Sequence, residues 1–309
     1  MFSKTRLKTW LTLLRLPNLF TVPGDPLAGY VLAVSLTGIF QWAEVLPCMV
    51  ASLCFYAAGI LSNDYFDIEE DKRYRPRRPL PSGLVLPQTV FLAAFILSLI
   101  GLIAAALSGP QASFTAFVLV ALVWIYNVAA KRHSVWGPVL MGGCRGLSLM
   151  MGAAAAGYQE ATVAPPAAAA IGLTAYIAIV SLIARDETRV TDLTKLRRLP
   201  AGILAVTLLL LVFLEWPAGI PVSAISMLGG FTGLAGLAAA VSAANRARAL
   251  AAPLAPPVVS QAVAGLIRGL LLFQAALCAG LMPDGTGAAI VLLVLFPLTG
   301  WLGRWFYGS

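Results

Sequence analysis

The stretch that decides the fold is 62-SNDYFDIEEDKRYRPRRPLPSG-83, a polar and largely charged segment. It lies between two apolar runs, at residues 45–63 and 88–108. Each run is long enough to cross about 30 Å of hydrocarbon as a helix that rises about 1.5 Å per residue. A short charged loop between two such runs indicates two membrane helices joined at one membrane surface.

The composition of the whole chain agrees with this interpretation. Hydrophobic residues make up 60% of the 309 residues and charged residues only 11%, whereas soluble domains carry about 25% charged residues. The mean hydropathy is +0.87. We therefore expect a polytopic, all-α membrane helix bundle, and no linker divides it, so residues 1–309 form a single membrane domain.

Apolar runs of membrane-spanning length recur along the chain. Gly and Pro inside them do not argue against helices, because membrane helices tolerate both residues. The predicted spans are 17–37, 45–63, 88–108, 112–130, 136–157, 166–184, 201–217, 221–244, 259–280 and 286–306.

The basic residues predict the orientation of these spans. Lys and Arg occur before the first span and in the loops after spans two, four, six and eight, whereas the opposite loops carry only acidic residues. Cytoplasmic loops retain basic residues. Both termini and the segment 62–83 are therefore expected on the cytoplasmic side, and a bacterial inner membrane is the expected location.

Several other classes of protein are disfavoured. The net charge of +8 is divided among short loops, so the topology explains it without nucleic-acid binding. The four cysteines lie inside apolar runs without the spacing of a zinc site or a disulfide framework. The first apolar run contains Pro17, Asn18 and Pro23, which favours a retained first helix over a cleaved signal peptide.

The carboxylates of the segment 62–83 have a regular spacing. If the second helix continues through it, Asn63, Asp64, Asp67 and Asp71 share one face, and Glu69 and Glu70 point elsewhere. Apposed carboxylates repel unless a cation occupies the site, and Mg²⁺ binds through one or two carboxylates plus substrate phosphate oxygens. On charge pattern alone, however, a solvated loop is the commoner explanation.

The segment resembles the first Asp-rich motif of the UbiA superfamily of intramembrane prenyltransferases, N-D-x-x-D-x-x-x-D followed by a basic, proline-rich run. Here it is NDYFDIEED and then RPRRPLPSG. LLRLPNLF, with Arg15 and Asn18, and YNVAAKR, with Tyr126, Lys131 and Arg132, extend the resemblance. The resemblance implies a nine-helix core around a central cavity, with the run 286–306 as an extra helix.

The resemblance also implies roles for individual residues. Asp64, Asp67 and Asp71 would bind one Mg²⁺, and Asp186 or Asp192 a second. Substrate contacts would come from a wider polar set, namely Asn18, Asn63, Arg75, Arg78, Tyr126, Lys131, Arg132 and Asp186. Arg145, a charge inside the fifth span, would line the substrate cavity or form a structural ion pair, and Asp25 and Arg268 leave the same two alternatives.

The second Asp-rich motif of the family is eroded in this sequence. It should follow span six, where the chain has IARDETRVTDLTKLRRLP. Thr188 stands four residues before Asp192, where the motif has an acid, and Asp186 is six residues back. On a regular helix Asp186 and Asp192 lie about 120° apart, so a complete two-metal site is in doubt.

The function implied by the resemblance is Mg²⁺-dependent transfer of a prenyl group from a polyprenyl diphosphate to an aromatic or other lipophilic acceptor. Diphosphate leaves the allylic donor and the acceptor captures the resulting carbocation. The eroded second motif keeps a non-catalytic isoprenoid-binding or transport protein open as the alternative. A CDP-alcohol phosphotransferase is disfavoured, because its D-G-x-x-A-R element is absent from the Asp motif.

Overall fold

The computed structural model describes most of the chain, and the described residues form helices, turns and loops. They are residues 4–34, 40–157, 163–185, 200, 202–203, 206–207, 256–279 and 283–306. The predicted spans 201–217 and 221–244 lie almost entirely outside these residues, as do Asp186 and Asp192.

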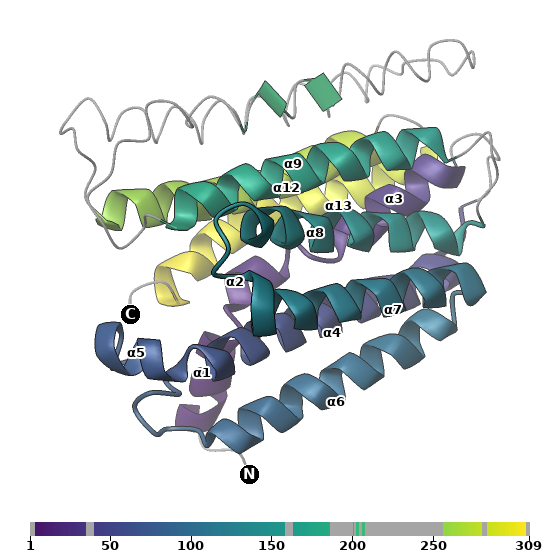
Figure 1. Cartoon of the computed structure of the whole chain (residues 1–309). Coiled ribbons are helices and arrows are strands. Elements are labelled where there is room, and N and C mark those ends of the chain that lie inside the picture. Colours follow the sequence, from purple (N-terminus) through teal and green to yellow (C-terminus); the bar gives the residue numbers. More distant parts are fainter. Residues whose placement is uncertain are drawn as a thin grey trace.

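Apart from the first, each predicted span within the described residues corresponds to one helical stretch (Figure 1). They are α1 Lys4–Leu13, α2 Leu16–Leu19, α3 Gly24–Val34, α4 Trp42–Phe66, α5 Ile68–Tyr74, α6 Pro87–Ala106, α7 Pro110–Ile125, the π-helix η1 Tyr126–Ala130, α8 Trp136–Ala155, α9 Ala164–Arg185, α12 Pro256–Ala279 and α13 Pro283–Phe306. Proline in the first turn begins α6 and α7, where its missing N–H has no helical partner.

Five helical stretches in the described residues are long and apolar enough to cross a membrane. They are Trp42–Phe66, Pro87–Ala106, Pro110–Ala130, Ala164–Arg185 and Val259–Ala279. Many large apolar side chains of α6 and α7 are exposed, including Phe114 and Ile103. Such surfaces are stable when lipid surrounds them, so the chain is a multi-pass integral membrane protein, as predicted.

The first predicted span, 17–37, is not one helix. It is broken into α2 and α3 by a turn at Phe20–Pro23. Pro23 has no N–H, and the Asp25 N–H donates to the carbonyl of Val22 instead of continuing the α-helical ladder. We expected proline to be tolerated within this span, but Pro23 lies at the break between the two helices.

Helix α8 lies at the centre of the bundle. It packs against α3, α7 and α9, and α12 packs against α3 and α13 (Figure 1). The approach of α3 to α8 requires glycine, because a Cβ on Gly152 would overlap the carbonyl oxygen of Pro26 and one on Gly29 would overlap that of Leu149. Small residues let membrane helices approach this closely.

One cluster of buried apolar side chains joins α4, α6 and α7 to α8, and another joins α1, α4 and α6. These clusters hold the end of α4 beside η1 and the α1–α2 junction. The polar segment that follows α4 is therefore surrounded by elements that are distant from it in sequence.

Candidate active site

The predicted continuous helix through the Asp-rich motif is interrupted at Asp67. Helix α4 ends at Phe66, Asp67 adopts φ −97° and ψ 4°, and α5 begins at Ile68. This part of φ/ψ space is sparsely populated and is frequent at active sites. The bend separates side chains that a straight helix would place on one face.

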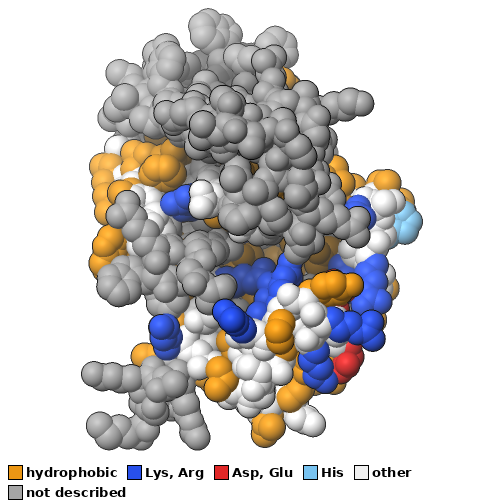
Figure 2. Space-filling view, turned by 90° about the vertical axis from the view of Figure 1, so that its left-hand side faces the viewer, with side chains coloured by type: hydrophobic (Ala, Val, Ile, Leu, Met, Phe, Trp, Pro, Cys, Tyr) orange, Lys and Arg blue, Asp and Glu red, His pale blue; other side chains and the backbone are white. Residues whose placement is uncertain are grey.

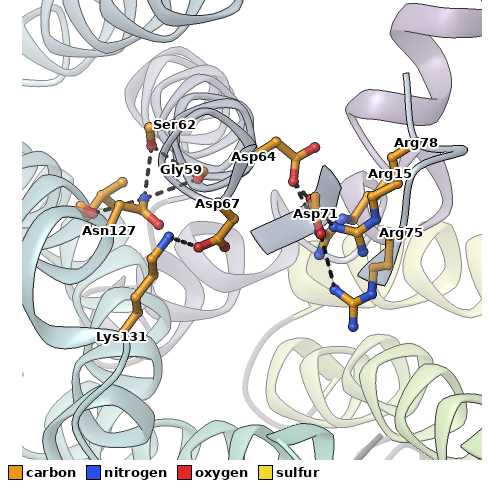
Figure 3. A network of polar contacts seen from close by, with 11 residues as sticks. Arg15, Gly59, Ser62, Asp64, Asp67, Asp71, Arg75, Arg78, Asn127 and Lys131 are labelled. Atoms are coloured by element: carbon orange, nitrogen blue, oxygen red, sulfur yellow. Dashed lines mark hydrogen bonds and ion pairs between the residues drawn. The ribbon is translucent and has the colours of Figure 1, made fainter. Parts of the chain in front are cut away.

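Asp64 and Asp71 lie on one side of the bend and share an arginine (Figure 3). Arg78 approaches Asp71 at 2.8 Å and Asp64 at 4.0 Å. Arg75 adds a contact to Asp71 at 3.7 Å, and Arg15 reaches Asp64 at 3.4 Å from the junction of α1 and α2. Both carboxylates are buried, so these guanidinium groups supply the charge compensation that burial demands.

Asp67 points to the other side, toward Lys131 (Figure 3), with Nζ and Oδ1 at 2.5 Å. Lys131 follows directly after the π-helix η1, in which the Lys131 N–H donates to the carbonyl of Tyr126 five residues earlier. Such π-turns are frequent at functional sites. Here the wider turn sets the position of the lysine relative to α4.

Asn127 anchors this π-helix to α4. Its side-chain Nδ2 donates to the carbonyl of Gly59 at 3.1 Å and to the hydroxyl of Ser62 at 2.9 Å. Asn127 is buried. Because Asp67 follows directly after α4 and Lys131 follows directly after η1, the amide fixes the relative position of the two charged residues.

The sequence predicted that three carboxylates converge on one spot, and the structure contradicts that arrangement. No group of three acidic, histidine or cysteine side chains in the described part of the chain is placed to hold one metal ion. The bend at Asp67 is the physical reason. The predicted exclusion of Glu69 and Glu70 is confirmed, because both are exposed.

Glu69 lies in the same motif but, unlike the buried aspartates Asp64 and Asp71, it is exposed. It accepts a hydrogen bond from Lys72 at 2.7 Å, and this contact holds the pKa of the Glu69 carboxyl below its ordinary value. The pair is exposed on α5, where such contacts contribute little stability. It is a surface pair beside the buried network.

The other predicted residues lie at different distances from the network. Asn63 lies beside Asp64, and Tyr126 lies near Asp67 and Arg15. Asn18 is buried in α2, and Arg132 is exposed. Arg145 contacts none of the motif carboxylates and forms a buried ion pair with Asp25 at 2.7 Å.

Cations outnumber carboxylates in this network. In the described residues it joins Asp64, Asp67 and Asp71 to Arg15, Arg75, Arg78 and Lys131. Figure 2 shows Lys and Arg side chains gathered on one face of the molecule with few acidic ones beside them. An excess of guanidinium and ammonium donors around buried carboxylates suits a phosphorylated ligand that brings its own metal ion.

Sequence reasoning missed two residues of this arrangement, Arg15 and Asn127, and one residue outside it, Gln274. Arg15 was noted only as part of a matching string, and its contact with Asp64 spans 49 positions. Asn127 lies inside the YNVAAKR match, where a buried amide in an apolar span was the available signal. Gln274 was not singled out, although it is a polar residue in the middle of a predicted span.

Known proteins resemble this chain in sequence and in fold. Digeranylgeranylglyceryl phosphate synthase from Sulfolobus acidocaldarius is 31% identical over 150 residues, which cover 48% of this chain and 54% of that protein. The enzyme of the same name from Methanosarcina mazei is 27% identical over 166 residues, covering 49% of this chain and 56% of its own. The matches therefore span about half the length of these relatives.

Solved structures share the fold over nearly their whole length. A digeranylgeranylglyceryl phosphate synthase superposes with a TM-score of 0.59 at 20% identity, covering 89% of this chain and 98% of that one. A UbiA homologue from Archaeoglobus fulgidus, bound to DMAPP and Mg²⁺, gives a TM-score of 0.58 at 12% identity, covering 95% and 98%. The model of the UbiA prenyltransferase family matches residues 26–255, and the chain belongs to this family.

Proposed function

We propose that the chain transfers a prenyl group from a polyprenyl diphosphate to a lipophilic acceptor within the membrane, in a Mg²⁺-dependent reaction. The observation that carries the proposal is the paired network at the end of α4. Three buried or half-buried aspartates of one motif are each matched by a cation brought from elsewhere in the chain or from the loop that follows.

The donor set fits Mg²⁺. Asp64 and Asp71 both lie within 4.0 Å of the same Arg78 nitrogen, so a cation between them would face both carboxylates. Mg²⁺ takes oxygen ligands and is commonly bound by one or two carboxylates plus substrate phosphates. Asp64 and Asp71 would hold it, Asp67 would join them only once the diphosphate takes Lys131 away from it, and Asp186 or Asp192 would hold a second ion. When bound, the metal stabilises the negative charge of the leaving diphosphate.

The cationic side chains would orient the diphosphate. Arg15, Arg75 and Arg78 present planar guanidinium groups that bind phosphate oxygens in pairs, and Lys131 presents a point charge. In the structure these groups pair with the aspartates. An arriving metal–diphosphate complex exchanges partners with them, because its phosphates attract the cations and its metal attracts the carboxylates. Asn63 beside Asp64, Tyr126 near Asp67, and Arg132 would add further contacts to the substrate.

The acceptor and the prenyl chain would lie among the apolar helices. The relatives named as digeranylgeranylglyceryl phosphate synthases favour a prenylated glycerol phosphate as the first acceptor to test, before aromatic acceptors.

In the orientation that we propose from the basic loops, this site and both chain termini lie on the cytoplasmic side of the membrane. A tag after Ser309 that reacts only from the opposite side of the membrane contradicts that orientation.

The site is tested by Asp67→Asn, with Glu69→Gln as the matched control. Both changes remove one carboxylate of the same motif and keep the side-chain volume, but Glu69 lies in an exposed surface pair. Mg²⁺-dependent binding of radiolabelled prenyl diphosphates is measured by scintillation counting with and without Mg²⁺. We expect Asp67→Asn to weaken binding and abolish turnover, and Glu69→Gln to resemble the parent chain. Unchanged Mg²⁺-dependent binding by Asp67→Asn overturns the metal assignment.

The eroded second motif supports one alternative, a protein that binds isoprenoid diphosphates without turning them over. Thr188 replaces an acid of the family pattern, which would leave a single-metal site. The same assay separates the two functions. Mg²⁺-dependent binding without product, across donors and acceptors, favours the binding protein.

A further inference from the structure

A buried polar cluster lies inside the bundle, separate from the Asp-rich network. Asp25 of α3, Arg145 of α8 and Gln274 of α12 are all buried. Arg145 Nε lies 2.7 Å from Asp25 Oδ2, and Gln274 Nε2 donates to Asp25 Oδ1 at 2.6 Å. Charges within a membrane bundle are expensive unless paired and usually mark a function, but none of these three residues belongs to the proposed diphosphate site.

The cluster also holds one backbone carbonyl. Arg145 Nη2 donates to the Thr21 carbonyl at 2.9 Å, and Gln274 Nε2 donates to it at 2.8 Å. Thr21 lies in the turn between α2 and α3, where the Asp25 N–H bonds to Val22 instead of Thr21. An unpaired carbonyl is unfavourable in an apolar interior, so these two side chains stabilise this particular turn.

A series of hydrogen bonds connects the turn to Arg15. The Thr21 N–H and hydroxyl both donate to the Asn18 carbonyl, at 3.1 and 2.8 Å. The Asn18 N–H donates to the Arg15 carbonyl at 2.9 Å. The Arg15 side chain then contacts Asp64 at 3.4 Å. The short helix α2 is thus held at both ends, by the cluster and by the α1 junction.

The backbone of Arg15 shows that this connection is under constraint. Its φ of 49° and ψ of 54° place it in the left-handed region, the one non-glycine residue with positive φ in the described part of the chain. This conformation is unfavourable for a residue with a side chain and persists where the surroundings fix it. Here it turns the chain between α1 and α2 at the residue whose side chain contacts Asp64.

We propose that Gln274, together with Arg145 and Asp25, is a positioning residue that sets the α2–α3 turn and thereby holds Arg15 at the diphosphate site. This inference rests on the proposed function for its effect on binding. Gln274 contributes no contact to the network of Figure 3. It acts through the Thr21 carbonyl, Asn18 and Arg15.

The test is a double-mutant cycle with Gln274→Met and Arg15→Met, measured by Mg²⁺-dependent binding of inorganic pyrophosphate. Gln274→Met keeps a similar volume but removes the amide donor. We expect it to weaken binding about tenfold, the effect of losing about one charge-assisted contact. In the Arg15→Met background it should have almost no further effect, since the connection is already broken. Additive effects of the two substitutions overturn the proposal.

A control and a second variant separate positioning from general destabilisation. Ser98→Ala removes the partly buried hydrogen bond that Trp124 of α7 donates to Ser98 of α6, and we expect it to leave pyrophosphate binding unchanged. Gly24→Ala displaces the Gln274 amide without a substitution in α12 itself, because the added Cβ would overlap that amide. It should reproduce the binding loss of Gln274→Met, and parental binding by a folded Gly24→Ala protein contradicts the proposal.

A measurement without ligand tests the positioning by itself. Amide hydrogen exchange of residues 14–23 should become faster in Gln274→Met and in Gly24→Ala, while exchange in α6 stays as in the parent. Unchanged exchange of residues 14–23 overturns the inference whether or not the chain binds diphosphate. Failure of the parent chain to bind pyrophosphate with Mg²⁺ instead refutes the proposed function.

Discussion

Replacing Lys131 with methionine is the sharpest perturbation of the diphosphate site. Lys131 lies where the π-helix ends, its side chain is 12% exposed, and its ammonium pairs with Asp67 at 2.5 Å. Methionine keeps an unbranched chain that can occupy the same space, so the main change is the loss of a desolvated positive charge.

The magnitude follows from the burial of this charge. A hydrogen bond to a charged group contributes about 1.5–3 kcal/mol when it is sheltered from water. Since about 1.4 kcal/mol corresponds to a tenfold change in affinity, Lys131→Met should weaken Mg²⁺-dependent diphosphate binding about 10- to 150-fold. Salt screens exposed charges more strongly than sheltered ones. The affinity loss caused by Lys131→Met should therefore persist at high salt, whereas the loss caused by removing an exposed charge should shrink.

Lys72→Met is the matched control. The Lys72 side chain is 50% exposed and pairs with Glu69, itself 76% exposed, so its loss should change affinity by less than about twofold. Affinity is measured by titration of labelled prenyl diphosphate into the purified protein at fixed Mg²⁺. Equal effects of the two substitutions, or an unaffected Lys131→Met, refute a specific phosphate contact at Lys131.

The remaining predictions concern the supports of the site. Asn127→Leu removes the amide that ties η1 to α4 through Ser62, so thermal unfolding should show a loss of about 1–3 kcal/mol, and diphosphate binding should weaken with it; parental values for both contradict the role of the amide. Gly152→Ala should lower thermal stability strongly, because its Cβ would overlap the Pro26 carbonyl. Gly287→Ala on α13 is the control for Gly152→Ala, because the added Cβ meets nothing within 4 Å. Similar effects of the two changes argue against the close contact between α3 and α8.

Much of the fold could be predicted because lipid imposes simple rules. Helices such as α4 and α6 must satisfy their own backbone and fill the thickness of the membrane, so their apolar runs show where they lie. The prediction of one helix over residues 17–37 was wrong, because the length of the apolar run and the local backbone chemistry favour different structures there. The apolar length indicated one helix, but a break is possible because Pro23 lacks an N–H and because two side chains donate hydrogen bonds to the Thr21 carbonyl.

The site could be predicted only in part. The residues of the Asp-rich motif were identified, since their spacing and charge are visible in the sequence. Their convergence was wrong, because a helical projection assumes a straight helix and α4 ends at Phe66. The contacts of Arg15, Asn127 and Gln274 join residues that are 49, 65 and 249 positions apart, and no local pattern encodes such distances.

The most direct test of the central claim is prenyl transfer by the purified chain in lipid nanodiscs. Radiolabelled prenyl diphosphates of several lengths are supplied with glycerol phosphate lipids and aromatic acceptors, with Mg²⁺ or with EDTA. The account predicts labelled lipid product and released pyrophosphate with Mg²⁺, and the loss of both with EDTA and in Asp67→Asn. Product formation that continues in EDTA, or no product from any donor and acceptor despite Mg²⁺-dependent binding, contradicts it.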